Sequence, residues 1–311
     1  MSAPAWHREA WDVLRARRER GAMPHALLLA GPSGLGKRAF AERLVRALLC
    51  SESVDSEACG HCRTCKLLDA GTHPDRVAIT FELNTSKTLR KTLVVEQIRD
   101  LSARLAMASQ LGGWQVATID PADAMTPAAA NALLKTLEEP TPSSLLILVA
   151  DAPWRLPATI RSRCQRMDFR LPSREDAMAW LHAQKISDAD EALTAAAGNP
   201  GLALAWSTQD LLAERQQVQS DLRALAQGKA DAYGVMRRWN DENLSQRLWF
   251  AASMAADASK ARAGRSPDTL TSRLSDEALT TWFEQANRAR EALRGPLRAD
   301  LVVLDLLSHW H

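Results

Sequence analysis

The sequence lacks a strong net charge, a long apolar run and an apolar leader, and each absence excludes a class of protein. Its 39 basic and 37 acidic residues leave a formal charge of only +2, so any contact with nucleic acid must come from a local patch. No uncharged apolar run approaches the roughly 18 residues of a membrane span. The charged start MSAPAWHREAWDVLRARRER has no apolar centre of the kind found in secretory signals. We therefore expect a cytoplasmic protein that makes no contact with membranes.

Length and composition predict a globular protein of two or three domains. The 311 residues are too many for one ordinary core, and 46% hydrophobic with 24% charged residues is an ordinary globular balance. In the first half, short apolar runs alternate with helical patterns, which predicts a parallel sheet covered by helices. The patterns place strands at 26–30, 114–119 and 144–150, and helices at 37–49, 127–138 and 159–165.

Beyond Phe169 the sequence predicts helices only. Alanine-rich amphipathic patterns continue to the end of the chain, and the stretch 257–276, rich in Ser, Arg, Gly and Asp, predicts a loop between helices. Pro172 and the Gly-Asn-Pro-Gly turn at 198–201 bracket a small helical domain. The predicted domains are therefore an α/β domain, a small helical domain and an all-helical domain, at 1–168, 169–207 and 208–311.

A glycine-rich loop follows the first predicted strand. Residues 31–37, GPSGLGK, fit the first seven places of the phosphate-loop pattern, between a buried strand and a helix. Backbone N–H groups and the helix N-terminus would face phosphates, and the lysine would reach the terminal ones. A glycine-rich turn without a ligand is the alternative. The candidate nucleotide-binding residues are Gly31, Ser33, Gly34, Gly36, Lys37 and, after the strand 114–119, Asp120.

Two residues that metal-assisted hydrolysis needs are missing around this loop. The eighth place of the pattern holds Arg38 instead of the Ser or Thr whose hydroxyl ligates magnesium. Directly after Asp120, where a glutamate would polarise the attacking water, stands Pro121. Neither residue can perform the missing task. The sequence therefore excludes turnover and leaves the binding of ATP or ADP open.

Four of the five cysteines lie in one short segment. Cys50, Cys59, Cys62 and Cys65 are separated by eight, two and two residues. Two Cys-x2-Cys steps let a tight turn place three thiolates on one ion, and Cys50, at the end of the preceding helix, supplies a fourth. In a reducing compartment this pattern favours a closed, tetrahedral structural zinc site. His61 can in principle replace a thiolate, and a redox dithiol is the alternative reading.

Four stretches resemble bacterial clamp-loader subunits of the AAA+ family. They are PHALL at 24–28 with GPSGLGK, the cysteine cluster, ANALLKTLEEP at 130–140 and LPATIRSRC at 156–164. The pairing of ANALLKTLEEP with SRC is specific for this family, and the resemblance covers residues 1–206. It implies an α/β AAA+ phosphate-loop domain with an inserted zinc module at 50–65, a small helical lid domain and an all-α collar domain that oligomerises.

Departures from the motor subunits of this family favour its non-motor, delta-prime class. Where motor subunits carry the sensor-one threonine and the sensor-two arginine, this chain has Ala150 and Gly201. Together with Arg38 and Pro121, these losses imply an AAA+ body kept for assembly. Arg163 of the SRC motif is retained, and the resemblance implies that it acts in trans, as an arginine finger on the ATP of an adjacent motor subunit.

The resemblance also implies partners and a place in DNA replication. The chain would belong to the DNA polymerase III holoenzyme without an activity of its own. Its partners would be the gamma/tau and delta subunits and, through the assembled loader, the sliding clamp and primer-template DNA. Two alternatives stay open: an active gamma/tau-like ATPase subunit of the same loader, and a free-standing zinc-dependent nucleic-acid-binding protein. The residues that can face DNA, or form an ordinary solvated surface, are Lys87, Arg90, Lys91 and Arg99.

Overall fold

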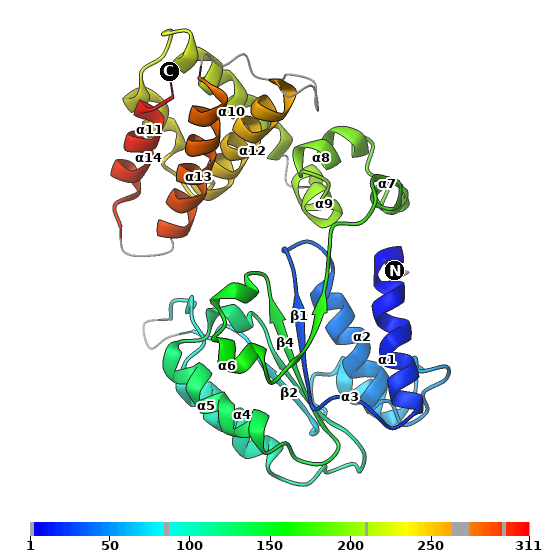
Figure 1. Ribbon diagram of the computed structural model, residues 1–311. Coiled ribbons are helices and arrows are strands. Elements are labelled where there is room, and N and C mark those ends of the chain that lie inside the picture. Colours follow the sequence, from blue (N-terminus) through cyan, green and yellow to red (C-terminus); the bar gives the residue numbers. More distant parts are fainter. Residues whose placement is uncertain (1–2, 84–86, 209–210, 263–273, 294–296, 311) are drawn as a thin grey trace. The chain divides into compact units, whose positions relative to one another are not determined.

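The computed structural model describes residues 3–83, 87–208, 211–262, 274–293 and 297–310 (Figure 1). The chain forms two compact units, which divide between Asp176 and Ala177. The finer division at 168/169 and 207/208 remains a prediction. Among the described residues, no helix combines the length and the apolarity that crossing a membrane requires.

A five-stranded parallel sheet forms the centre of the first unit. Strands β1 (Ala26–Ala30) and β4 (Ser144–Ala150) are buried along their whole length, and their continuous apolar runs are typical of strands covered on both faces. In spatial order the strands are β2 (Arg76–Ile79), β3 (Gln115–Ile119), β4 (Ser144–Ala150), β1 (Ala26–Ala30) and β5 (Gln165–Asp168).

Helices cover both faces of this sheet (Figure 1). Those of the first unit are α1 (Arg8–Glu19), α2 (Lys37–Leu49), α3 (Arg63–Asp69), α4 (Val95–Leu105), α5 (Pro127–Glu138) and α6 (Ala158–Arg161), with short 3-10 turns at Ala5–His7, Ala122–Ala124 and Pro153–Arg155. Neighbouring residues of a strand point to opposite faces, so one apolar run serves two cores. From β1, Leu28 packs in the core with α4 and α5, whereas Leu27 and Leu29 pack in the core with α1 and α2.

Most of the elements predicted for the first unit are confirmed, and one is corrected. Strands 26–30 and 144–150 and helices 37–49 and 127–138 have the predicted bounds, and the strand predicted at 114–119 starts at Gln115. The helix predicted at 159–165 was wrong beyond Arg161. Gln165 begins β5, whose backbone pairs with β1 at the edge of the sheet.

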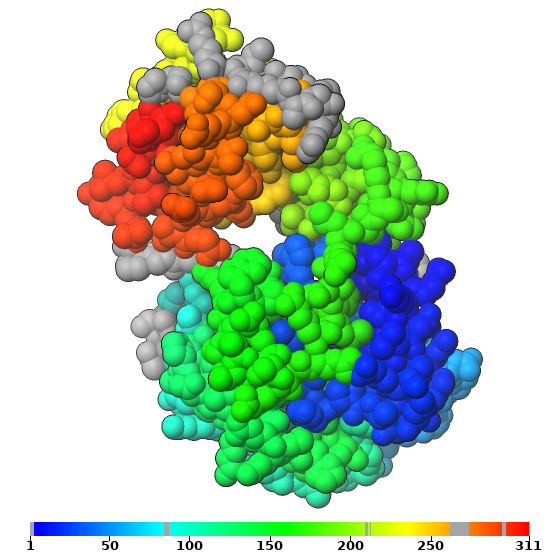
Figure 2. Space-filling view, in the orientation of Figure 1, coloured from blue at the N-terminus to red at the C-terminus, as the bar shows by residue number. Residues whose placement is uncertain are grey.

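The edge strand β5 lies beside α1 on the surface of the first unit. Arg17 of α1 donates a hydrogen bond to the side chain of Gln165. Figure 2 shows the side chains of α1 (dark blue) next to green side chains of the region that includes β5. A broad groove of about 1210 Å³ is lined by α1 and residues 165–172. The contact fixes the N-terminal helix against the edge of the sheet.

The described residues of the second unit form helices joined by turns and loops, and no strand, as predicted. Trp206, Trp239, Trp282 and Trp310 are buried in its apolar core. The loop predicted at 257–276 was wrong for 257–262, which continue α12, and its part at 263–273 lies outside the described residues. The helices are α7 (Arg174–Ala183), α8 (Ala189–Ala195), α9 (Pro200–Thr208), α10 (Leu211–Ala226), α11 (Ala232–Trp239), α12 (Leu244–Arg262), α13 (Asp276–Ala292) and α14 (Ala299–Ser308).

A buried carboxylate joins α10 to α11 in this unit. Asp221 has a side chain only 5% exposed, and it accepts hydrogen bonds from Trp239 Nε1 at 2.8 Å and from Arg238 Nη2 at 2.7 Å. Nearby, Arg247 of α12 binds Glu214 of α10 at 2.6 Å. These pairs connect α10, α11 and α12 through polar side chains, in addition to the apolar core.

Replacing Asp221 with Ala should destabilise the second unit by about 1–3 kcal/mol, because it leaves the buried indole N–H of Trp239 without an acceptor. The free energy of unfolding in urea, followed by tryptophan fluorescence, measures the loss. Glu284→Ala is the matched control, since it removes an exposed pair with Arg288 and should change stability by less than about 0.5 kcal/mol. Equal losses in the two variants would show that the buried carboxylate has no special role.

Candidate functional site

The phosphate loop lies at the carboxyl end of β1, the edge at which parallel sheets place their ligand sites. Gly31 directly follows the strand, and α2 begins at Lys37. Gly34 and Gly36 have φ angles of 84° and 80°, in the left-handed region that glycine adopts freely. At Gly36 an added β-carbon would also lie 2.7 Å from the ring of His7. Glycine at this position therefore serves both the turn and the packing around it.

Two residues near the N-terminus hold the loop, and neither was predicted. Nε2 of the buried His7 lies 2.8 Å from the carbonyl oxygen of Leu35, and Trp6 Nε1 donates to the same oxygen at 3.1 Å. The His7 ring packs edge-on against Phe40 and Phe169. Burial lowers the pKa of His7, so the ring is neutral at pH 7 and donates through Nε2–H. His7 and Leu35 are 28 positions apart in the sequence, so no local sequence pattern predicts their contact.

The ammonium group of Lys37 is turned into its own loop. Its side chain is 1% exposed, and Nζ lies 2.6 Å from Asp151 Oδ1. The same nitrogen donates to the carbonyl oxygens of Gly31 and Pro32, each at 2.7 Å. Burial lowers the pKa of Lys37, and the ion pair with Asp151 opposes this. An ammonium has three protons, and all three have acceptors within the chain.

Arg38 joins the carboxyl ends of two neighbouring strands. Its Nε lies 2.9 Å from Asp120 Oδ2, directly after β3, and its Nη2 lies 3.1 Å from Asp151 Oδ2, directly after β4. Burial raises the pKa of Asp151, but Lys37 and Arg38 outweigh it and hold that pKa below its ordinary value. For Asp120 burial prevails, and the pKa is raised. We call Lys37, Arg38, Asp120 and Asp151 the ion cluster.

The structure places the other substituted positions as the sequence indicated. Pro121 follows Asp120, and Ala150 ends β4 as a fully buried residue, so neither brings a polar side chain to the loop. Gly201 lies in α9 of the second unit. Asp151 was missed, although it follows the strand 144–150 just as Asp120 follows 114–119. The signal that identified one carboxylate could have identified both.

The four clustered cysteines meet as a metal site requires. Their sulfur atoms all lie within 4.8 Å of one another, and Cys50 Sγ is 3.6 Å from Cys59 Sγ and 3.7 Å from Cys62 Sγ. A tetrahedral ion with bonds of about 2.3 Å separates its sulfur ligands by about 3.8 Å. The spacing in this chain therefore fits four thiolates around one ion. His61 lies at the exposed rim, with Nδ1 3.0 Å from the Cys59 carbonyl oxygen.

Local structure stabilises the anionic form of one of these sulfurs, Cys62, whereas burial raises the pKa of Cys50 and raises that of Cys65 to about 12. Cys50 caps the C-terminus of α2, and Cys62 caps the N-terminus of α3, where its sulfur accepts the N–H of Cys65. Burial raises the pKa of Cys62, but hydrogen bonds from Thr64 and Ser51 outweigh it and lower that pKa to about 4. The fifth cysteine lies outside this cluster, buried in the core beneath α6.

Arg163 connects the two sequence motifs that are specific for the resembling family. Its Nη2 lies 2.6 Å from Glu138 Oε1, at the end of α5, and its Nη1 donates to the carbonyl oxygen of Thr159 at 3.1 Å. The arginine side chain is 37% exposed, and the next residue, Cys164, is buried. The buried cysteine fixes the backbone of the motif while the guanidinium stays accessible to solvent.

The basic residues considered as a DNA patch lie between β2 and α4 or on α4 itself. Lys87, Lys91 and Arg99 are exposed, and Arg90 is half-buried. The backbone N–H of Arg90 donates to the carbonyl oxygen of Glu82 at 2.8 Å. The exposed positions are compatible both with a patch that faces DNA and with an ordinary solvated surface.

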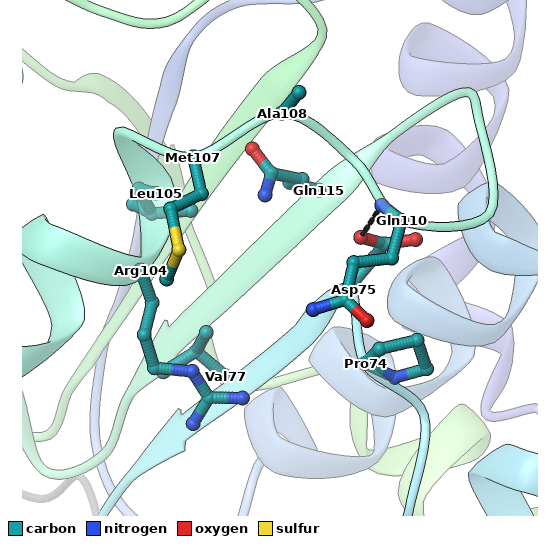
Figure 3. A pocket seen from close by; sticks show the side chains of 9 residues that line it. All are labelled: Pro74, Asp75, Val77, Arg104, Leu105, Met107, Ala108, Gln110 and Gln115. Atoms are coloured by element: carbon teal, nitrogen blue, oxygen red, sulfur yellow. Dashed lines mark hydrogen bonds between the residues drawn. The ribbon is translucent and has the colours of Figure 1, made fainter.

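A small pocket of about 100 Å³ opens at the opposite end of the sheet (Figure 3). It is lined by Asp75 and Gln115, at the amino ends of β2 and β3, and by residues 104–110. The Asp75 carboxylate accepts the N–H of Gln110 at 2.7 Å and the N–H of Leu111 and the hydroxyl of Ser109 at 3.0 Å each. Asp75 therefore fixes the loop after α4, and both of its carboxylate oxygens accept hydrogen bonds.

Comparison with known proteins decides which family this architecture represents. The family described as "DNA polymerase III, delta subunit" matches residues 6–173. The DNA polymerase III subunit delta' of Pseudomonas aeruginosa is 37% identical over 251 residues, covering 79% of this chain and 74% of the relative. That of Escherichia coli K12 is 34% identical over 318 residues, covering 97% and 93%. The chain belongs to the delta-prime family of DNA polymerase III subunits.

Membership of the delta-prime family confirms the resemblance predicted from the four motifs. Among solved structures, a DNA polymerase III gamma subunit-related protein of Thermotoga maritima is similar to the chain with a TM-score of 0.45 and 18% identity, covering 96% of this chain and 97% of that one. The family assignment rests on the sequence relatives.

Replacing Asp151 with Asn should destabilise this delta-prime chain at neutral pH, and the loss should shrink in acid. The folded pKa of Asp151 lies below its ordinary value of 3.8, so its stabilising effect is complete above that value and is lost as the pH falls through the folded pKa. The gap between wild type and variant should be constant above about pH 5 and narrow below it. Urea unfolding between pH 7 and pH 3 measures the gap.

Asp12→Asn is the control for this experiment. It removes an exposed ion pair with Arg15 at 3.2 Å, which should contribute little at any pH. A gap for Asp151→Asn that did not change with pH would contradict the ion pairing of its carboxylate.

Proposed function

We propose that this chain is the non-motor subunit of the DNA polymerase III clamp loader. In this role it assembles with the gamma/tau and delta subunits and helps to load the sliding clamp onto primed DNA. Family membership carries the proposal, because relatives that cover up to 97% of the chain are named delta-prime subunits. The proposed architecture is an AAA+ domain with a zinc module, a small helical lid domain and a helical collar domain.

The ion cluster supports a non-motor role over an active ATPase. All three ammonium protons of Lys37 are bound within the chain. Arg38 stands in place of the hydroxyl that ligates magnesium, and Pro121 in place of the glutamate that polarises water. Hydrolysis at this loop therefore has neither its metal ligand nor its base. ATP or ADP would have to displace contacts that the folded chain already makes.

Arg163 is proposed to act in trans on the ATP of an adjacent gamma/tau subunit. Its side chain is accessible, and its ion pair with the half-exposed Glu138 is weak enough to exchange for a phosphate. A guanidinium placed against a transferring phosphoryl group stabilises the charge that develops there. The residue would thus contribute to catalysis at a site that it does not itself contain.

The four-cysteine site is proposed to hold a structural zinc ion. Four thiolates close the tetrahedron, so zinc would have no open position for a reacting water. Its contribution would be to fix residues 50–65 between α2 and α3. This zinc site, rather than DNA binding by the chain alone, accounts for the cysteine pattern in a protein whose net charge is only +2.

Substituting Arg163 with Ala should slow ATP hydrolysis at the adjacent motor site of the reconstituted loader by about 10³-fold or more, as for other trans-acting arginines. The measurement is single-turnover hydrolysis in the presence of clamp and primed DNA, with assembly checked by gel filtration. Arg161→Ala, at an exposed arginine of the same segment, is the matched control and should leave the rate unchanged. Hydrolysis by the isolated chain, or indifference of the loader to Arg163→Ala, would contradict the proposal.

The purified chain should contain one zinc ion, and Cys59→Ser should abolish its stoichiometric binding. Elemental analysis measures the content, and cobalt substitution should give the absorption of a tetrahedral thiolate site. Cys164→Ala is the control, because that cysteine lies in another core and should leave the metal content at one. Full zinc retention in Cys59→Ser would refute the four-thiolate site.

A further inference from the structure

The place that a magnesium ion takes in a phosphate loop is filled in this chain by a side chain. In active phosphate-loop enzymes, the hydroxyl of the eighth residue and a carboxylate at the end of a neighbouring strand hold the metal. Here the eighth residue is Arg38, and its guanidinium contacts two such carboxylates, Asp120 Oδ2 at 2.9 Å and Asp151 Oδ2 at 3.1 Å. The residues present therefore do not fit a metal ion.

Charge and geometry both oppose the entry of a divalent cation. The cluster contains two cations and two carboxylates, and the remaining oxygen of Asp151 is bound by Lys37 at 2.6 Å. Apart from the buried Asp120 Oδ1, a metal would have to take carboxylate oxygens that Lys37 and Arg38 now hold. It would also meet the positive charge of Arg38, which stays protonated at any ordinary pH.

We propose that Arg38 is a built-in cation that replaces magnesium, so that the loop of this chain does not accept a metal–nucleotide complex. The replacement keeps both carboxylates paired and ties the ends of β3 and β4 to the start of α2. It concerns the loop of this chain alone, and it is independent of the proposed action of Arg163 in trans.

Removing the guanidinium should expose a cation site. Asp120 Oδ1 is buried and has no hydrogen-bond partner among the described residues, so Arg38 satisfies only one oxygen of this carboxylate. Without Arg38, two carboxylates at the loop would share a single counter-ion, Lys37. Carboxylate oxygens are the ligands that magnesium and manganese prefer, and a threonine at position 38 would add the missing hydroxyl.

The experiment compares the zinc-loaded chain with its Arg38→Thr variant, using Mn²⁺ as the probe in place of Mg²⁺. Electron paramagnetic resonance counts bound Mn²⁺ with and without ATP, and a fluorescent ATP analogue reports the nucleotide affinity. Wild type should bind no stoichiometric Mn²⁺, and Mg²⁺ should not strengthen nucleotide binding. Arg38→Thr should bind one Mn²⁺ together with ATP and should bind nucleotide at least about tenfold more tightly with Mg²⁺ than without.

Three further variants make the result specific. Arg38→Lys keeps a cation and should behave as wild type, whereas Arg38→Ala vacates the position and should bind Mn²⁺, more weakly than Arg38→Thr. Adding Asp120→Asn to Arg38→Thr should abolish the gained Mn²⁺ binding. Circular dichroism verifies the fold, and if Arg38→Thr does not fold, Arg38→Ala serves in its place. Tight binding of Mn²⁺ with ATP to the wild-type chain would overturn the proposal, as would a folded Arg38→Thr or Arg38→Ala that gains no Mn²⁺ binding.

Discussion

The ion cluster of Lys37, Arg38, Asp120 and Asp151 is the interaction on which the shape of the phosphate loop depends. Asp120 and Asp151 directly follow β3 and β4, and Lys37 and Arg38 are the first two residues of α2, so the cluster ties α2 to the ends of these strands. Partly buried charges are tolerated where each one has a partner. Each charged group of the cluster has an oppositely charged partner within the chain. The loop therefore has a defined structure that needs no nucleotide to stabilise it.

The parallel sheet supplies the geometry that this cluster needs. Strands β3, β4 and β1 are neighbours, so their carboxyl ends meet at one edge and bring together residues that are more than 100 positions apart in the chain, such as Arg38 and Asp151. From that edge the chain continues through α6 to Arg163, whose backbone is fixed by the buried Cys164. The segment from Asp151 to Arg163 thus joins the ion cluster to an arginine that is accessible to solvent.

The sequence predicted those parts whose signals are local. Buried strands such as 26–30 show continuous apolar runs, the loop shows its glycine spacing, and the four cysteines show metal-ligand spacing. The edge strand at 165–168, QRMD, was missed because it has no apolar run, and its pairing with β1 is a tertiary event. The same holds for His7, which reaches the loop across 28 residues. Asp151 is a different case. Its position directly after a buried strand was a local signal, and this signal could have identified it.

An arginine at position 38 stabilises the two neighbouring carboxylates in a way that a neutral residue could not. A metal-binding loop that loses its metal keeps two carboxylates close together, and like charges in a partly buried site repel each other and raise the pKa of one of them. A neutral side chain at position 38 would leave that repulsion in place, opposed only by Lys37. A guanidinium instead bridges both carboxylates with donors in a fixed plane. The fold around this loop can therefore be kept without a metal ion, while Arg163 stays accessible to solvent.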